Sequence, residues 1–282
     1  MGVDFGKTFS RALEYGFDLN KLLPFFLMNL SIVAIALIFI NNLSDIVSIL
    51  MAGSNATAAL NLVTGILVII LIMLVIGLVR IFFQAVVTDN ARLYWQKKNV
   101  KLSKSYSIAK KKYVTIIFAL LLSGIISGFV STVLVFAGTI GAFLSMISSF
   151  ILAFIFLFLI QIIVISNKGV VDSIREGYRL FSKNILDVFI FWLILMILSF
   201  IIICIALIPL LISIIPVVAP LIESASSSSI VDASVIGEIM VLIKANMLGF
   251  AIAGAISALI VSYMQVFKES ALTFFYLQKK KR

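Results

Sequence analysis

Few residues of this sequence have the types and the spacing that catalysis or metal binding requires. The chain has no histidine, so it lacks the commonest general base and the commonest metal ligand, and its single cysteine, Cys204, lies in an apolar run. It contains no glycine-rich phosphate loop, no residue spacing typical of a zinc site and no nucleophile motif. The sequence therefore predicts a protein that is not an enzyme and that needs no cofactor and no metal.

The remaining candidates are polar residues in or beside apolar runs. Asp89 and Asp187 lie at the ends of such runs, whereas the carboxylates of pumps and ion-coupled carriers lie within the spans. Asn29 and Gln161 are the polar residues that we expect inside the membrane. For both amides, a hydrogen bond to a neighbouring helix is favoured over a transport site.

Helices that cross a membrane must position these residues. Hydrophobic residues make up 63% of the 282 residues and charged residues only 12%, which is about half the share usual in soluble proteins. Five runs contain no charged residue, at 22–44, 62–79, 113–167, 188–222 and 245–267. One helix over 113–167 would be about 80 Å long, far more than a bilayer core of about 30 Å. This run is therefore predicted to hold two spans joined by a turn at 137–141.

The predicted fold is an all-α integral membrane protein with six transmembrane helices in three hairpins. An amphipathic helix in the membrane interface is expected before each hairpin. The clearest of these covers 170–183, where Val170, Ile174 and Tyr178 recur on one face and charged residues fill the other. Weaker patterns occur at 1–21 and near the end of 80–112.

Two smaller features complete the predicted helices. Pro209, Pro216 and Pro220 follow in the second half of the fifth apolar run, so we expect that helix to end or kink near Pro209. After the sixth run, the basic tail from 268 is expected to form a short helix of its own.

The distribution of charge predicts the orientation. The chain has 22 Lys and Arg against 12 Asp and Glu, a net charge of +10, and every basic residue except Lys244 falls in 1–21, 80–112, 168–183 or 268–282. The positive-inside rule then places both termini and these four segments in the cytoplasm, with the loops 41–61 and 223–244 outside a cell membrane.

The basic segments are expected to contact anionic lipid headgroups at the cytoplasmic face. Orientation accounts for the positive charge, so no nucleic acid partner is expected, whereas a membrane protein partner stays possible. The residues predicted to contact headgroups are Lys97, Lys98, Lys110, Lys111 and Lys112.

A threefold internal repeat is predicted within this single membrane domain, with units at about 1–98, 99–167 and 168–282. Gln84, Gln161 and Gln265 would then occupy equivalent positions near the cytoplasmic ends of the second, fourth and sixth spans. An amide that faced lipid would leave its donors and acceptors unmet, so each should point to a neighbouring helix or reach interfacial water. Chance similarity among apolar segments is the alternative to a repeat.

Small residues at helical spacing predict sites of close helix packing. A GxxxG pattern joins Gly124 and Gly128 in the third span, and Gly249 with Ala253 gives a similar pair in the sixth.

The stretch SIREGYRLFSKNILDVF at 173–189, the glutamines of the even-numbered spans and the six-span layout carry a resemblance. The chain resembles a poorly characterised family of prokaryotic membrane proteins, similar to the membrane domain attached to some glycerophosphoryl diester phosphodiesterases. In fused members a soluble catalytic domain follows. The resemblance brings no catalytic residue to this chain and implies a membrane module.

Together these observations favour a non-catalytic multi-pass membrane protein that acts as a structural, lipid-contacting or assembly module. The alternative is a transporter or pore for an uncharged or lipid-like solute, with a cavity between the repeats. A polar, water-accessible cavity across the middle of the membrane would favour the alternative.

Overall fold

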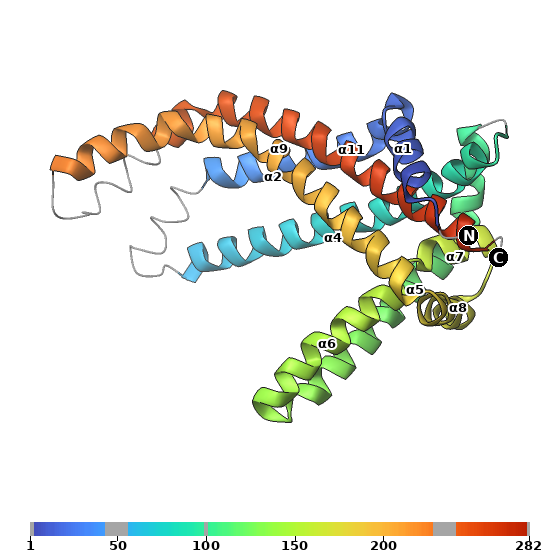
Figure 1. Cartoon of the computed structure of the whole chain (residues 1–282). Coiled ribbons are helices and arrows are strands. Elements are labelled where there is room, and N and C mark those ends of the chain that lie inside the picture. The colour runs from blue at the N-terminus through green and yellow to red at the C-terminus, as the bar shows by residue number, and fades with distance from the viewer. Residues whose placement is uncertain (1–2, 43–55, 99–100, 228–240, 281–282) are drawn as a thin grey trace. The chain divides into compact units, whose positions relative to one another are not determined.

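A computed structural model describes residues 3–42, 56–98, 101–227 and 241–280 (Figure 1). The described residues form helices and turns, with no strand among them. Six segments are long and apolar enough to cross a membrane, which confirms the predicted all-α six-span class. Most of the predicted outer loops lies outside the described residues, at 43–55 and 228–240. The six segments are Leu19–Asn41, Val63–Trp95, Leu102–Val135, Gly138–Ser166, Ile185–Ala219 and Met247–Lys280.

Short connections join consecutive helices between residues 102 and 227. Their bounds are α1 Phe5–Gly16, α2 Leu19–Asn41, α4 Ala56–Trp95, α5 Leu102–Val135, α6 Gly138–Phe156, α7 Leu159–Ser166, α8 Val170–Lys183, α9 Ile185–Ser227 and α11 Met247–Lys280.

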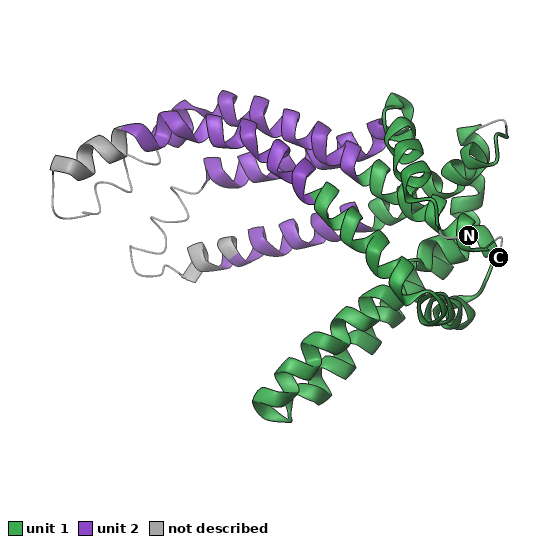
Figure 2. Ribbon diagram, in the orientation of Figure 1, with its two compact units in different colours: residues 1–21, 78–199, 265–282 green, residues 22–77, 200–264 purple. Residues whose placement is uncertain are grey.

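The chain forms two compact units, which Figure 2 shows in green and purple. Unit 1 comprises residues 1–21, 78–199 and 265–282, and unit 2 comprises residues 22–77 and 200–264. Long helices such as α4, α9 and α11 contribute to both. These units do not follow the boundaries of the three predicted repeats, so the repeat stays a prediction.

The turn inside the long apolar run lies where the sequence predicts it. Helix α5 ends at Val135 and α6 begins at Gly138, and the two helices pack together as a hairpin (Figure 1). Gly138 has a φ of +70°, in the left-handed region that side-chain-bearing residues rarely adopt. The glycine therefore lets the chain reverse within a few residues.

Several helices are longer than the sequence analysis predicts. Helix α5 begins at Leu102, so the middle amphipathic segment is its first turns and not a separate helix. The fifth helix does not end near Pro209, because α9 continues to Ser227, and a kink there stays a prediction. In unit 2, the Ser257 hydroxyl donates to the Ala206 carbonyl at 2.6 Å, three residues before Pro209. This bond joins α9 to α11 close to Pro209.

The C-terminal part of α11 forms the centre of unit 1. The prediction of a separate tail helix is wrong, because α11 runs without a break to Lys280 and every side chain from Ala271 to Leu277 is buried. The Phe275 ring stacks on Phe191 of α9 at 4.4 Å and on Phe158 at 5.3 Å, measured between ring centroids. This apolar core surrounds the end of the helix with protein.

Helix α8 packs against α5, α6 and α7. Its buried residues are Ser173 and Gly177, whereas Val171 and Tyr178 stay exposed, at 62% and 59%. A Cβ atom at Gly177 would lie 2.3 Å from the carbonyl oxygen of Ile155. Only glycine permits this close approach, and the exposed apolar edge remains available to lipid, as expected of an interfacial helix.

Candidate functional site

A cavity of about 630 Å³ lies in unit 1 where the end of α7, helix α8 and the end of α11 come together. Its lining includes one carboxylate, Glu176, and the side chains of Ser166, Asn184 and Tyr276. The excess of positive charge makes this cavity suited to an anion. Five cationic residues line it: Lys168, Arg179, Lys183, Lys279 and Lys280.

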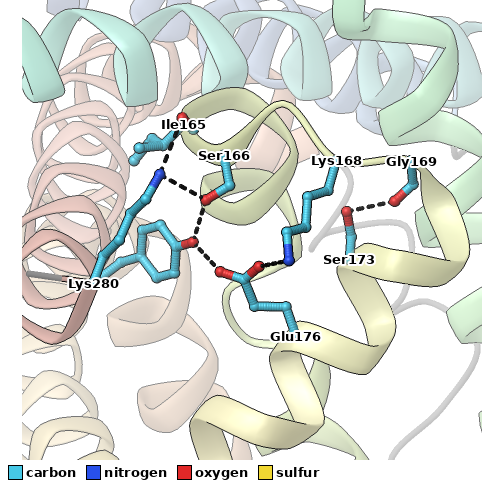
Figure 3. A network of polar contacts seen from close by, with 8 residues as sticks. Ile165, Ser166, Lys168, Gly169, Ser173, Glu176 and Lys280 are labelled. Carbon is cyan, nitrogen blue, oxygen red and sulfur yellow. Dashed lines mark hydrogen bonds and ion pairs between the residues drawn. The ribbon is translucent and has the colours of Figure 1, made fainter. Parts of the chain in front are cut away.

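A network of polar contacts holds the three helices in place around Glu176 (Figure 3). Lys168 Nζ forms an ion pair with Glu176 Oε2 at 2.5 Å, and the Tyr276 hydroxyl donates to Glu176 Oε1 at 2.5 Å. The Ser166 and Tyr276 hydroxyl oxygens are 2.6 Å apart. Because the only hydroxyl hydrogen of Tyr276 goes to Glu176, Ser166 must donate to Tyr276. Lys280 Nζ in turn donates to Ser166 Oγ at 3.0 Å.

The turn between α7 and α8 places Lys168 beside Glu176. Asn167 takes a left-handed conformation, with φ 56° and ψ 38°, and so ends α7, as asparagine often does after a helix. The carbonyl of Gly169 then accepts the Ser173 hydroxyl at 2.7 Å, which secures the first turn of α8 (Figure 3).

Glu176 is a charged partner for Lys168 at neutral pH. Burial opposes its ionisation, but hydrogen bonds from Lys168 and Tyr276, with the attraction of Lys168 and Arg179, outweigh burial and lower the pKa of Glu176 below its ordinary value of 4.5. One cation of the cavity is therefore neutralised. Lys279 is likewise paired with Asp187, and it donates to Asn184 Oδ1 at 2.7 Å.

Three cations of the cavity form no ion pair among the described residues, and one of them, Lys280, donates to Ser166 Oγ. Arg179 and Lys183 are the other two. They lie four residues apart on α8, so they share one face. Both side chains are exposed, and neither takes part in the ion pairs formed among the described residues. The arrangement can bind an anionic group such as a phosphate through a guanidinium and an ammonium.

Two amides bond within the protein as the sequence analysis favours. In unit 2, Asn29 Nδ2 donates to Ser262 Oγ at 2.8 Å, from α2 to α11. In unit 1, Gln161 Nε2 donates to Glu269 Oε2 at 3.1 Å, from α7 to α11. Gln161 and Gln265 are buried and Gln84 is half-buried.

The predicted aspartates bind other parts of the chain. Asp89, fully buried near the end of α4, accepts the Ser105 hydroxyl of α5 at 2.9 Å and forms an ion pair with Arg92. These contacts join the two helices, so the carboxylate has a structural role. The neighbouring Asn90 Oδ1 accepts the Tyr15 hydroxyl of α1 at 2.7 Å.

Sequence reasoning missed Glu269, because the sixth apolar run was taken to end at Phe267. The side chain of Glu269 is only 5% exposed. A signal was present in the sequence: Gln265, Glu269, Thr273 and Tyr276 recur at four- and three-residue spacing, which places them on one face of α11. All four are buried.

The lysines predicted to contact headgroups lie elsewhere in unit 1. Lys97, Lys98, Lys110 and Lys111 are exposed and Lys112 is half-buried. None of them lines the cavity at α8, so their contact with lipid stays a prediction.

Among the described residues, the predicted packing glycines do not lie at close helix contacts. A Cβ atom added at Gly124, Gly128 or Gly249 would meet none of the described atoms within 4 Å, whereas Ala253 is buried. Close approach occurs instead at Gly177 in unit 1 and at Gly254 in unit 2, where an added Cβ would lie 2.5 Å from Val33 Cγ1.

No group of three or more histidine, cysteine, aspartate and glutamate side chains that could hold a metal occurs among the described residues. Comparison of the chain with family models, curated proteins and solved structures finds no match.

Proposed function

We propose that the protein is a non-catalytic multi-pass membrane module that binds anionic lipid headgroups at the cytoplasmic face of the cell membrane. The observation that carries this proposal is the cavity at α8, where Arg179 and Lys183 lie without an ion-pair partner among the described residues. A headgroup phosphate would supply the missing negative charge.

The surroundings of the two cations support a lipid as the ligand. Helix α8 carries the exposed apolar residues Val171 and Tyr178 beside its charged face, and a helix of this kind lies in the membrane interface. The positive-inside rule puts this helix at the cytoplasmic leaflet, whose anionic lipids attract basic residues by about 1 kcal/mol each. The lipid headgroup and helix α8 would therefore lie at the same depth in the membrane.

Lipid titration of the purified protein tests this function. The full-length protein in neutral detergent is titrated with short-chain phosphatidylglycerol and, separately, phosphatidylcholine, and the unfolding temperature reports binding. We expect phosphatidylglycerol to stabilise the protein more. Replacement Arg179→Gln should weaken this binding about fivefold, the equivalent of about 1 kcal/mol.

Arg175→Gln is the matched control, because Arg175 is exposed on the same helix and does not line the cavity. The two variants have the same net charge, so the loss of a general electrostatic attraction would affect both equally. Equal phosphatidylglycerol affinities of the two variants would show that the cavity is not the binding site.

A further inference from the structure

A second cavity in unit 1, of about 220 Å³, lies beside the interruption between α6 and α7. Most of its lining is apolar, from residues such as Leu120, Phe156 and Leu159. Its polar lining comes from Gln84 of α4, Gln161 of α7, and Lys268 and Glu269 of α11. The polar lining of this cavity therefore consists of two amides, one ammonium group and one carboxylate, whereas five cations line the cavity at α8.

Two of these polar groups lie side by side and are buried. Gln161 and Glu269 are 1% and 5% exposed, and the amide donates to one carboxylate oxygen at 3.1 Å. The amide oxygen, Gln161 Oε1, is buried and has no hydrogen-bond partner. An unpaired acceptor next to a carboxylate is costly in a protein interior, and a positively charged donor or ion would satisfy both groups.

The interruption of the helix brings further acceptors near the cavity. Helix α6 ends at Phe156, so the carbonyl of Phe156 has no partner within its own helix. Of the two carbonyls before it, that of Phe154 accepts the backbone N–H of Leu157, and that of Ile155 lies against Gly177 of α8. Phe156 and Leu157, at this end, line the cavity. Interrupted membrane helices are known to coordinate cations through such carbonyl groups. Oxygen ligands from carboxylate, amide and carbonyl groups suit alkali and alkaline-earth ions.

The charge of the surroundings limits the ligand to a single positive charge. One carboxylate lines the cavity, whereas a divalent ion usually needs more. Lys268 and Arg80 also act on the Glu269 carboxylate through space, and they oppose a second cation. Neither forms an ion pair with Glu269 among the described residues, so the carboxylate stays available.

We propose that Glu269 and Gln161 form a site for a monovalent cation, either an alkali-metal ion or a primary ammonium group. This site goes beyond the proposed lipid function and does not depend on it, because the two cavities share no lining residue. An occupied site would tie α7 to α11 beside the interruption.

The unfolding temperature of the full-length protein in phosphatidylcholine nanodiscs tests this inference. It is measured in sodium, potassium and methylammonium chloride at one ionic strength, with choline chloride as reference, because choline has no N–H donor. We expect at least one of the three cations to raise the unfolding temperature by several degrees over choline. A response to sodium or potassium identifies an alkali ion, and a response to methylammonium alone identifies an ammonium group.

Variants separate this site from a general salt effect. Glu269→Gln keeps the size of the side chain and an acceptor for Gln161, so we expect it to fold and to lose the cation response completely. Asp172→Asn is the matched control, since Asp172 is exposed on α8, and it should keep the response. Lys268→Met removes a competing charge and should increase the response.

Three results would overturn the inference. The wild-type protein could unfold at one temperature in all four salts, Glu269→Gln could retain the full response, or a response could occur only in Lys268→Met. The last result would mean that the Lys268 ammonium itself fills the site. Since none of these variants changes the basic cavity, a failure here would leave the lipid titration of the Arg179→Gln variant unaffected.

Discussion

The replacement Gly177→Ala tests how closely α8 must approach the junction of α6 and α7. The new Cβ atom would lie 2.3 Å from the carbonyl oxygen of Ile155 and 3.8 Å from Ile162 Cδ1. A carbon and a carbonyl oxygen approach each other to about 3.3 Å at the closest. The contact with Ile155 is to backbone, which cannot rotate away, so α8 must move outwards by roughly 1 Å.

The expected change in the free energy of unfolding of Gly177→Ala combines destabilising and stabilising contributions. Overpacking of this kind costs about 1–3 kcal/mol, and alanine in place of a helical glycine returns up to about 1 kcal/mol. Displacement of α8 also stretches the bond from Tyr276 to Glu176, and hydrogen bonds to charged groups contribute about 1.5–3 kcal/mol. We therefore expect a net loss of about 2 kcal/mol in the free energy of unfolding.

Denaturant unfolding in mixed micelles measures this loss, with Gly124→Ala as the matched control. An added Cβ at Gly124 meets none of the described atoms within 4 Å, so that variant should be as stable as the wild type or slightly more stable. A Gly177→Ala protein as stable as Gly124→Ala would refute the close contact. If it is destabilised but binds phosphatidylglycerol as the wild type does, the position of α8 does not control the cavity.

Three further predictions concern charge and topology. Burial, followed by the charges of Asp18 and Asp89, raises the pKa of Tyr15 above its ordinary value of 10.0. The folded protein therefore holds the Tyr15 proton more tightly than the unfolded chain does, so the free energy of unfolding should decrease as the pH rises above 10. The denaturant midpoint should fall over this range in the wild type and should fall less in Tyr15→Phe. Glutamine in place of the three lysines at 110–112 should weaken correct insertion or stability in anionic bilayers, and an unchanged orientation and melting temperature would contradict this. In a Cys204→Ser background, a cysteine at Ser54 should react with an impermeant reagent from outside intact cells and one at Ser103 should not.

Composition and apolar run length were enough to predict the six spans. Each span needs about 20 apolar residues, and the uncharged runs are long enough to supply them. The turn at 137–141 was predictable because Gly138 offers a conformation that most residues avoid. These features depend on local chemistry, which can be read from a short stretch of sequence.

The ends of the helices were not predictable from charge. Arg80 lies inside α4 and Lys268 inside α11, although both follow an uncharged run directly. A helix ends where its backbone bonding is interrupted, and a charged side chain does not interrupt it. Conversely, a helix can be interrupted where the sequence gives no signal. The interruption between α6 and α7 at Leu157 and Phe158 contains neither glycine nor proline, so tertiary packing must determine its position.

The burial of Glu269 could have been predicted from the spacing of polar residues on α11, which a count of charged residues does not reveal. Gln265, Glu269, Thr273 and Tyr276 form a polar stripe on one face of α11. Apart from Lys268, the residues between them are small or apolar, unlike the broad charged face of a helix that borders water. A narrow polar stripe on an otherwise apolar helix therefore predicts contacts with other helices, as Glu269 makes with Gln161 and Tyr276 with Glu176. Both cavities border this helix, because its polar face meets polar side chains of α7 and α8.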